Sequence, residues 1–178
     1  MQWPEYMPYQ PVVGGLPHEL DRASAQKRFD DIMVHKAERV AQLGKVVEAN
    51  GFRLGSDDDS LDALDDFFRT NVEPSASDPS RMMNIWYAMA FDIALHLGDV
   101  IIERAPSLRW DFFRWGPTGP GRDMSYHQPV IMGYSGTEPL LSRELIVTVS
   151  WYGVECMGGE VDEAGYFKQI VTYDVANA

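Results

Sequence analysis

The chain has 178 residues, of which 45% are hydrophobic and 12% aromatic, and this composition excludes an intrinsically disordered protein. With 27 acidic and 15 basic residues, its net charge is −12. Binding to phosphate backbones or anionic lipid depends on lysine and arginine, so this charge disfavours nucleic acids and membranes as partners and favours a basic protein. The alternative is that the acidity only keeps the protein soluble.

Length and cysteine content indicate a single-domain cytoplasmic protein. A chain of 178 residues is typical of one domain. Cys156 is the only cysteine, and no basic residue stands beside it to activate the thiol, so we interpret it as a packing residue. The first residues lack the pattern of a secretory signal, and charged residues interrupt the longest apolar run, which argues against a membrane span.

Residues 1–19 carry four prolines together with Trp3, Tyr6 and Tyr9. The prolines prevent a regular helix, and large aromatic side chains are rare in flexible tails. We therefore predict an extended arm that packs either over the domain formed by residues 20–178 or over a neighbouring subunit. In the second case the arm would support a homodimer.

Two helices are predicted in the first half of the domain. Apolar residues three or four apart over residues 24–50 predict an amphipathic helix, which Asp21 or Ser24 can cap. A shorter helix is predicted over residues 61–71, after an acidic loop whose negative charge suits a helix N-terminus.

The longest apolar run, from Met82 to Arg104, predicts the central helix of the fold. It is apolar around most of its girth, so other elements must cover it on several sides. We expect Ser80 to cap its start and Pro106 to end it. One narrow polar ridge remains on it, formed by Asp92, His96, Asp99 and Glu103.

The polar ridge has two interpretations. It is either the one solvent-facing or partner-facing side of the helix, or an acid–base or metal site, because a histidine and a carboxylate three residues apart occur in metal sites of helical bundles. A metal would also need ligands from a facing helix. The other predicted helices show no comparable set, so we predict no metal and no cofactor.

Aromatic residues are concentrated at 108–115 and 126–134, which predict the two strands of an antiparallel hairpin that packs against the central helix. Pro129 cannot donate a hydrogen bond to a neighbouring strand, so we place the second strand at the sheet edge. Three arginines form either an anion pocket beside Trp110 and Trp115 or pairs with local acids. They are Arg109, Arg114 and Arg122.

The C-terminal third is ambiguous between strand and helix over residues 140–158. The run Ile146–Val149 favours a strand, whereas apolar residues spaced three or four apart favour a helix. We choose the helix, with Thr137 as its cap and Pro139 in its first turn, and predict a last short helix over 162–175. The predicted fold is α+β and mostly helical, with a central buried helix packed by other helices and an antiparallel β-hairpin.

Catalytic and ligand motifs are incomplete in this chain. The acidic stretch that begins at Asp57 fails as a calcium loop, because Asp62 stands where such loops need glycine and Phe68 where they need glutamate. Ser135 lacks the surroundings of a nucleophilic serine, and the glycines after residue 115 lack the lysine of a phosphate loop. We therefore assign no catalytic residue.

Three segments occur in an order that resembles small bacterial domains of unknown function, including the immunity proteins of polymorphic-toxin systems. They are FDIALHLGDVIIE, LRWDFF and QPVIMG, within residues 80–135. The resemblance implies a small, acidic, cytosolic protein that occludes the active site of a toxin. It implies no catalytic residues.

Three functional hypotheses follow, of which the last is a homodimeric structural protein whose arm, residues 1–19, wraps the neighbouring subunit. The first is a non-enzymatic acidic domain that binds a basic protein such as a cognate toxin, with its electrostatic contact formed by Asp57, Asp58, Asp59, Asp62, Asp65 and Asp66. The second is a small hydrolase or ligand-binding domain. Its site would comprise Asp92, His96, Asp99, Glu103, Arg109 and Arg114.

Overall fold

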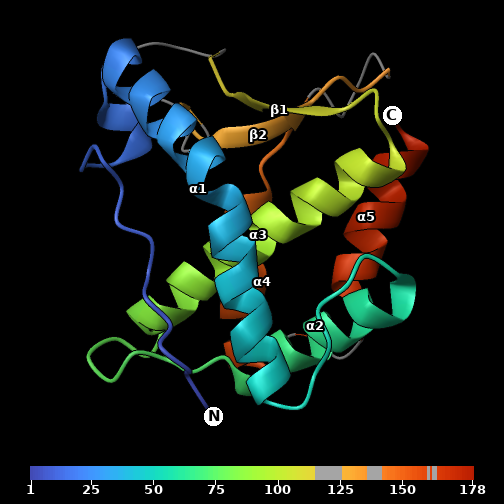
Figure 1. The fold of residues 1–178 in the computed structure, drawn as a ribbon. Helices are drawn as coiled ribbons and strands as arrows, with labels where there is room; N and C mark the ends of the chain where they lie inside the picture. The colour runs from blue at the N-terminus through green and yellow to red at the C-terminus, as the bar shows by residue number, and fades with distance from the viewer. Residues whose placement is uncertain (115–125, 136–141, 160, 162–163) are drawn as a thin grey trace.

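The computed structural model describes residues 1–114, 126–135, 142–159, 161 and 164–178 (Figure 1). The helices in these parts are a 3₁₀ turn (Pro17–Glu19) and α1 (Arg22–Ala49), α2 (Asp58–Asn71), α3 (Asn84–Arg104), α4 (Leu145–Gly158) and α5 (Tyr166–Ala176). The strands are β1 (Arg109–Phe112), β2 (Pro129–Met132) and β3 (Ser142–Arg143). The prediction of an α+β, mostly helical fold is confirmed.

Helix α3 is the central element. It crosses the middle of the molecule in Figure 1, with α1 in front of it and α2 below it. The side chains of Trp86, Met89, Ile93, Leu97 and Ile101 are fully buried. Such cover on several sides is what a helix that is apolar around its girth requires.

By length and composition alone, α3 could also cross a membrane. In the folded chain, however, 67% of its most apolar 18-residue window is buried by other parts of the protein. The core helix of a folded domain has the same composition, and its apolar surface is covered by protein.

The three strands form one antiparallel sheet in the order β1-β2-β3. The prediction that Pro129 places its strand at the edge is therefore wrong, because β2 is the middle strand. The short β3 pairs only with Ile131 and Met132, so it does not reach Pro129 and needs no N–H there. Strand β3 itself was not predicted.

Strand β1 packs against α3, as predicted for the hairpin. The ring of Trp110 lies so close to Gly98 that a Cβ at position 98 would stand 2.0 Å from Trp110 Cζ2. The indole Nε1 donates a hydrogen bond to Asp99 Oδ1 at 3.1 Å. Only glycine at position 98 permits this approach of the strand to the helix.

The helix ends agree with the predictions in part. Asp21 caps α1 by accepting a hydrogen bond from the Ser24 amide, whereas Ser80 does not cap α3. Ser80 instead donates to Asp78, and α3 begins after Met83 without a side-chain cap. Residues 145–158 are helical, so the choice of helix over strand is confirmed there. It is wrong at residues 142–143, which form β3, and Glu144 precedes the helix where Thr137 was expected. Several predicted features lie outside the described residues: the turn 116–122 with Arg122, Trp115, Thr137, Pro139, and residues 162–163 of the last helix.

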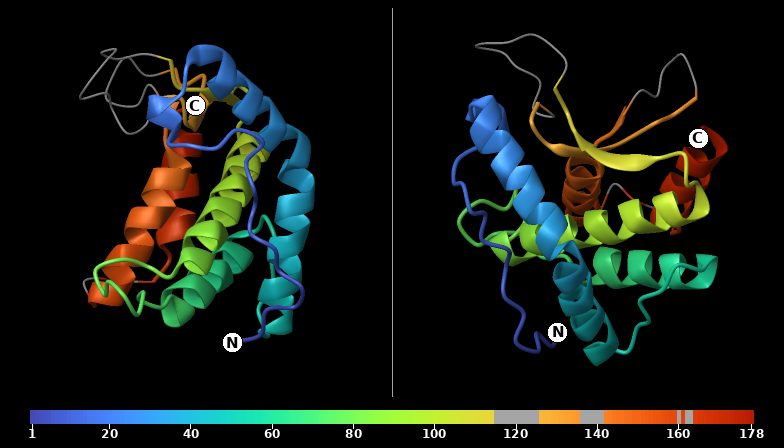
Figure 2. Two further views of the ribbon diagram at one scale, coloured as in Figure 1. Left: turned by 90° about the vertical axis from the view of Figure 1, so that its left-hand side faces the viewer. Right: turned by 45° about the horizontal axis from the view of Figure 1, so that its top comes forward.

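The arm, residues 1–19, runs antiparallel to α1 (Figure 2). The Gln2 amide bonds to Asn50 near the end of α1, and the Tyr9 hydroxyl bonds to Asp31 near its start. Trp3 packs edge-on against Trp86 of α3. The aromatic side chains of the arm are thus packed within their own chain.

Candidate functional site

The polar ridge of α3 does not form one surface. Asp92 and His96 are buried, Asp99 is 38% exposed at its side chain, and Glu103 is exposed. The prediction of a single solvent-facing or partner-facing ridge is therefore wrong. The arm and α1 cover Asp92, and the loop before α2 covers His96.

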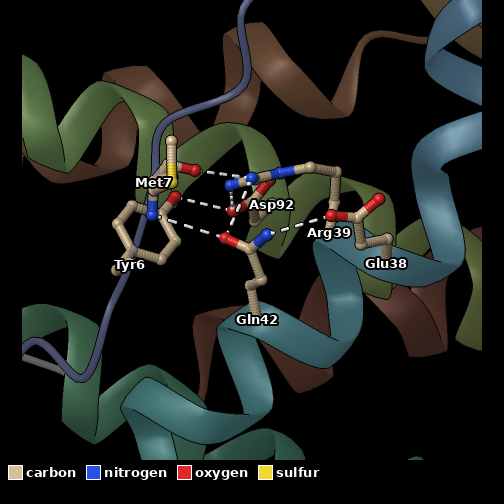
Figure 3. Close-up of polar contacts among 6 residues, drawn as sticks. All are labelled: Tyr6, Met7, Glu38, Arg39, Gln42 and Asp92. Carbon is tan, nitrogen blue, oxygen red and sulfur yellow. Dashed lines mark hydrogen bonds and ion pairs between the residues drawn. The ribbon is translucent and has the colours of Figure 1, made fainter.

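Asp92 is the centre of a buried network that joins three segments of the chain (Figure 3). Arg39 of α1 donates from Nε to Asp92 Oδ1 at 2.9 Å and from Nη2 to Oδ2 at 2.5 Å. The hydroxyl of Tyr6 donates to the same Oδ2 at 2.6 Å. Arg39 Nη1 also donates to the Met7 carbonyl at 2.6 Å and to Gln42 Oε1 at 3.2 Å. The network ties the arm and α1 to α3.

Burial and hydrogen bonding have opposite effects on the pKa of Asp92 in this network. The side chains of Arg39 and Asp92 are 6% and 0% exposed. Burial raises the pKa of Asp92, while the hydrogen bonds from Arg39 and Tyr6 hold that rise back. Burial and the neighbouring Asp92 also raise the pKa of Tyr6, so its hydroxyl stays protonated and can donate. A two-bond arginine–carboxylate pair is the geometry that best compensates buried charge, and we interpret the network as structural.

The sequence carries a signal for this network that the helix prediction did not use. Arg39 stands seven residues after Ile32 and four before Leu43, both of which are buried in α1. A charged residue on the inward side of an amphipathic helix needs a buried partner of opposite charge.

His96 and Asp99 have separate partners. His96 Nε2 lies 3.1 Å from the Gly55 carbonyl oxygen, and burial lowers the pKa of His96 against the opposing effects of that bond and of Asp99. Asp99 pairs with Lys36 of α1 and accepts from Trp110. Within the described parts of the chain, no group of three or more His, Cys, Asp or Glu side chains is arranged to hold a metal ion.

Arg109 and Arg114 of the hairpin both pair with Asp111 of β1. Arg114 Nη2 lies 3.2 Å from Asp111 Oδ1, and Arg109 Nη2 lies 3.9 Å from Asp111 Oδ2. His96 instead contacts the loop before α2. The hairpin arginines and the ridge histidine, which the second hypothesis combined in one site, therefore have different partners.

A second buried ion pair was not predicted. Arg143 of β3 donates to Asp174 Oδ1 from Nε at 3.0 Å and from Nη2 at 2.7 Å, and the side chain of Asp174 is 0% exposed. The sequence indicates this pair as it does Arg39, because Asp174 follows Phe167 and Val171 at helical spacing on the inward side of α5. This pair joins the sheet to the last helix.

Five of the six aspartates predicted to form a partner contact reach the surface of α2. They are Asp57, Asp58, Asp59, Asp62 and Asp66. The sixth, Asp65, is fully buried and accepts a hydrogen bond from the Gly165 amide at 2.8 Å, so it does not belong to this acidic surface. Burial raises the pKa of Asp65.

Basic side chains of the same chain balance most of the acidic surface. Asp58 pairs with Arg104 at 2.8 Å, and Asp62 pairs with Lys168. Two further pairs are Asp57 with Arg53 and Asp66 with Arg69, each at 2.8 Å. Asp57 is also the N-cap of α2, where hydrogen bonds from Ser60 lower its pKa. The acidic surface therefore combines local ion pairs with helix capping.

Cys156 agrees with its interpretation as a packing residue. It is half-buried in α4, and burial raises the pKa of its thiol to about 11. At neutral pH the thiol is protonated, whereas a reactive cysteine needs the thiolate.

An apolar groove lies between α4 and the start of α3 and was not predicted. Its volume is about 370 Å³, and its lining includes Tyr87, Ile146, Val147 and Val154 together with Trp151. Trp151 is 58% exposed. Partly exposed tryptophan and tyrosine beside a groove are typical of protein contact surfaces.

Comparisons with models of known protein families, with curated proteins and with solved structures find no match to this chain. The burial, partners and charges of the residues above are therefore the basis for a functional proposal.

Proposed function

We propose that this protein is an acidic, non-enzymatic protein-binding domain that neutralises a basic protein, such as a bacterial toxin, by covering its active site. The observation that carries the proposal is the net charge of −12. A field of this sign speeds encounter with a basic surface and suppresses encounter with phosphate backbones. The resemblance of residues 80–135 to immunity proteins supports the same function.

The environment of the polar ridge also supports a binding role. Asp92 is held by Arg39 and Tyr6, and His96 contacts the Gly55 carbonyl. Both groups belong to the site of the second hypothesis, and each takes part in packing one segment against another. Recognition would then use the exterior of the domain.

The exposed aspartates of α2 would supply the short-range contacts to the partner. Their present partners are surface side chains, and such exposed ion pairs contribute at most about 1 kcal/mol each. Lysine or arginine of a bound protein can therefore replace Arg104 or Lys168 as the partner of Asp58 or Asp62. Long-range attraction would come from the net charge of the whole chain.

The proposal is tested by identifying the partner and measuring its inhibition. The products of genes that neighbour this one in its native genome are the first candidates. A basic candidate that is toxic when expressed alone should become harmless when this protein is coexpressed, and the purified pair should form a stoichiometric, inactive complex. If no neighbouring product binds, and affinity capture from the native host returns no basic protein, the proposal fails.

A charge variant then tests the contact surface. Neutralising Asp58, Asp62 and Asp66 together as Asn should slow association with the partner by about tenfold or more, because Arg104, Lys168 and Arg69 would remain unpaired on the contact surface. The matched control changes three exposed glutamates elsewhere, Glu38, Glu48 and Glu73, to Gln. An equal effect of both variants would place the contact outside α2.

A further inference from the structure

A polar pocket of about 280 Å³ lies where the start of α1 meets the β-hairpin. Its described lining comes from three segments: Arg22 at the first position of α1, Arg114 after β1, and Tyr126 and His127 before β2. No carboxylate is among these described lining residues. The pocket therefore gathers cationic and hydrogen-bond-donating groups on a chain whose net charge is −12.

Arg22 stands at a position where a cation is unfavourable for the helix. It is the first residue of α1, and the N-terminal end of a helix dipole favours negative charge. Within the described parts of the chain Arg22 forms no ion pair and no side-chain hydrogen bond, although acidic residues outnumber basic ones by 27 to 15. An anion bound at this end of α1 would pair with Arg22 and would also suit the dipole.

His127 is held in an unfavourable backbone conformation. Its φ of 65° lies in the left-handed region, which residues other than glycine rarely adopt. The His127 N–H donates to the Phe113 carbonyl at 2.8 Å, and the Phe113 N–H donates to the Gln128 carbonyl at 2.9 Å. The imidazole is buried and contacts the rings of Phe112 and Tyr126. Residues held under such strain are concentrated at functional sites, and the ring of this one lines the pocket.

Arg114 is positioned by two contacts on its own strand. Its Nη2 lies 3.2 Å from Asp111 Oδ1, and its guanidinium lies over the ring of Phe112, 5.1 Å from the ring centre. A guanidinium has five N–H donors in a planar fork, so an arginine that contacts one carboxylate through Nη2 can also take part in binding a second anion. Arg114 thus brings a fixed positive charge to the side of the pocket opposite α1.

We propose that the pocket formed by Arg22, Arg114, Tyr126 and His127 binds the phosphate group of a small molecule. Arginine binds phosphate through paired hydrogen bonds, and a tyrosine hydroxyl and an imidazole N–H can donate to further oxygens. Donors from three segments suit a tetrahedral anion, whose oxygens point in several directions, better than a planar carboxylate. The volume is at the lower limit for ligand pockets, so the molecule that carries the phosphate is small.

The negative charge of the whole chain is compatible with this site. Charges more than about 10 Å apart are largely screened at moderate ionic strength, so one phosphate group responds to the charges at the pocket. A nucleic acid would extend over the wider surface, whose net charge repels it. In Figure 1 the first turns of α1 lie beside the sheet at the top of the molecule, whereas α2 lies below α3. The pocket is therefore separate from the acidic surface of α2.

The first test is a titration of the full chain with inorganic phosphate, followed by NMR at an ionic strength held constant with sodium chloride. We expect saturable shifts at residues 22, 114, 126 and 127 with a dissociation constant on the order of 1 mM or tighter. Malonate, whose charge is carried by carboxylates, should bind at least tenfold more weakly. Equal binding of malonate would overturn the assignment to phosphate, and the absence of saturable shifts at these residues would overturn the site.

The second test removes each arginine of the pocket. Arg114→Gln and Arg22→Gln should each weaken phosphate binding at least tenfold. The matched control for the first is Arg109→Gln, because Arg109 contacts the same Asp111 but is not among the described lining residues. The control for the second is Lys27→Gln, which removes one positive charge from an exposed position of α1. Both controls should bind phosphate as the wild type does.

The third test separates the nitrogens of His127 from its packing. His127→Phe keeps a ring beside Phe112 and Tyr126 and removes both nitrogens, so phosphate binding should weaken at least threefold while the thermal unfolding midpoint without phosphate stays close to that of the wild type. If this variant does not fold, the arginine variants decide the question, since they change exposed side chains.

Two further outcomes would overturn the inference: control variants that lose as much phosphate binding as the pocket variants, or pocket arginine variants that bind phosphate as the wild type does. Neither outcome affects the proposed function, because the exposed aspartates of α2 lie outside this pocket. Failure to find a basic protein partner would likewise leave phosphate binding to be measured on the isolated chain.

Discussion

Asp92 of α3 and Asp58 of α2 are both paired with an arginine, but they lie in opposite settings. Asp92 is fully buried and accepts two hydrogen bonds from Arg39, whereas the side chain of Asp58 is 60% exposed and pairs with Arg104. Desolvation makes a buried carboxylate depend on its partner, while water can replace the partner of an exposed one. Burial therefore decides the role of each acid: buried Asp92 holds the fold together, whereas exposed Asp58 contributes little to stability.

The largest expected effect is at the buried pair. Asp92→Ala leaves Arg39 buried without its carboxylate, and we expect a loss of about 3–5 kcal/mol in the free energy of unfolding, measured by urea denaturation. The control is the double variant Arg39→Met and Asp92→Leu, which removes both charges at similar volume and should recover most of the loss. A loss below about 1 kcal/mol for Asp92→Ala would remove the distinction between the two regions.

The next largest loss of stability is expected in the arm, where one tyrosine bonds to a buried aspartate and another to a partly buried one. Tyr6→Phe removes a buried hydrogen bond to Asp92 and should cost about 1.5–3 kcal/mol, because the acceptor is charged. Tyr9→Phe removes a similar bond to Asp31, which is only partly buried, and should cost less. Equal losses, measured in the same denaturation experiment, would show that burial does not set the strength of the arm's attachment.

A third effect concerns pH. Burial lowers the pKa of His96 in the folded protein below the ordinary histidine value of about 6.5. When the pH falls below about 6.5, the unfolded chain therefore binds more protons at this residue than the folded protein does. Stability should therefore fall as pH decreases through this value. His96→Gln removes the titrating group and should flatten the slope between about pH 7.5 and 5, compared with the wild type. Parallel curves for both proteins would contradict the assignment of His96 as a buried neutral group.

The smallest effect is expected on α2. Asp58→Ala or Asp62→Ala should change the free energy of unfolding by no more than about 1 kcal/mol, because both ion pairs are exposed to solvent. Denaturation in low and high salt measures this. A loss comparable to that of Asp92→Ala would mean that these aspartates also hold the fold together and are not available to a partner.

The sequence predicts the elements of this fold better than their contacts. Periodicity places α1, α2 and α3 within three residues at each end, because each buries an apolar stripe that repeats at helical spacing. It places the end of α4 but not its start, because residues 142–143 pair with β2 as strand β3. The middle position of β2 was not predictable in the same way. It depends on β3, a pairing of only two residues that leaves no periodic pattern of its own.

The candidate site was less predictable than the fold. Helical spacing places Asp92 and His96 on one ridge, but their burial depends on the arm and on the loop before α2, which are distant in sequence. Asp65 shows the same limit, since its cover comes from Gly165. Arg39 and Asp174 carried a usable signal, because each stands at an inward position of its helix.

The most direct measurement of the proposed function is the association rate with the basic partner as a function of ionic strength. We expect the logarithm of the rate constant to fall steeply as salt increases, and the variant with Asp58, Asp62 and Asp66 changed to Asn to lose part of that dependence, because most of the net charge remains. A rate constant that is independent of salt in the wild type would contradict recognition through the acidic exterior.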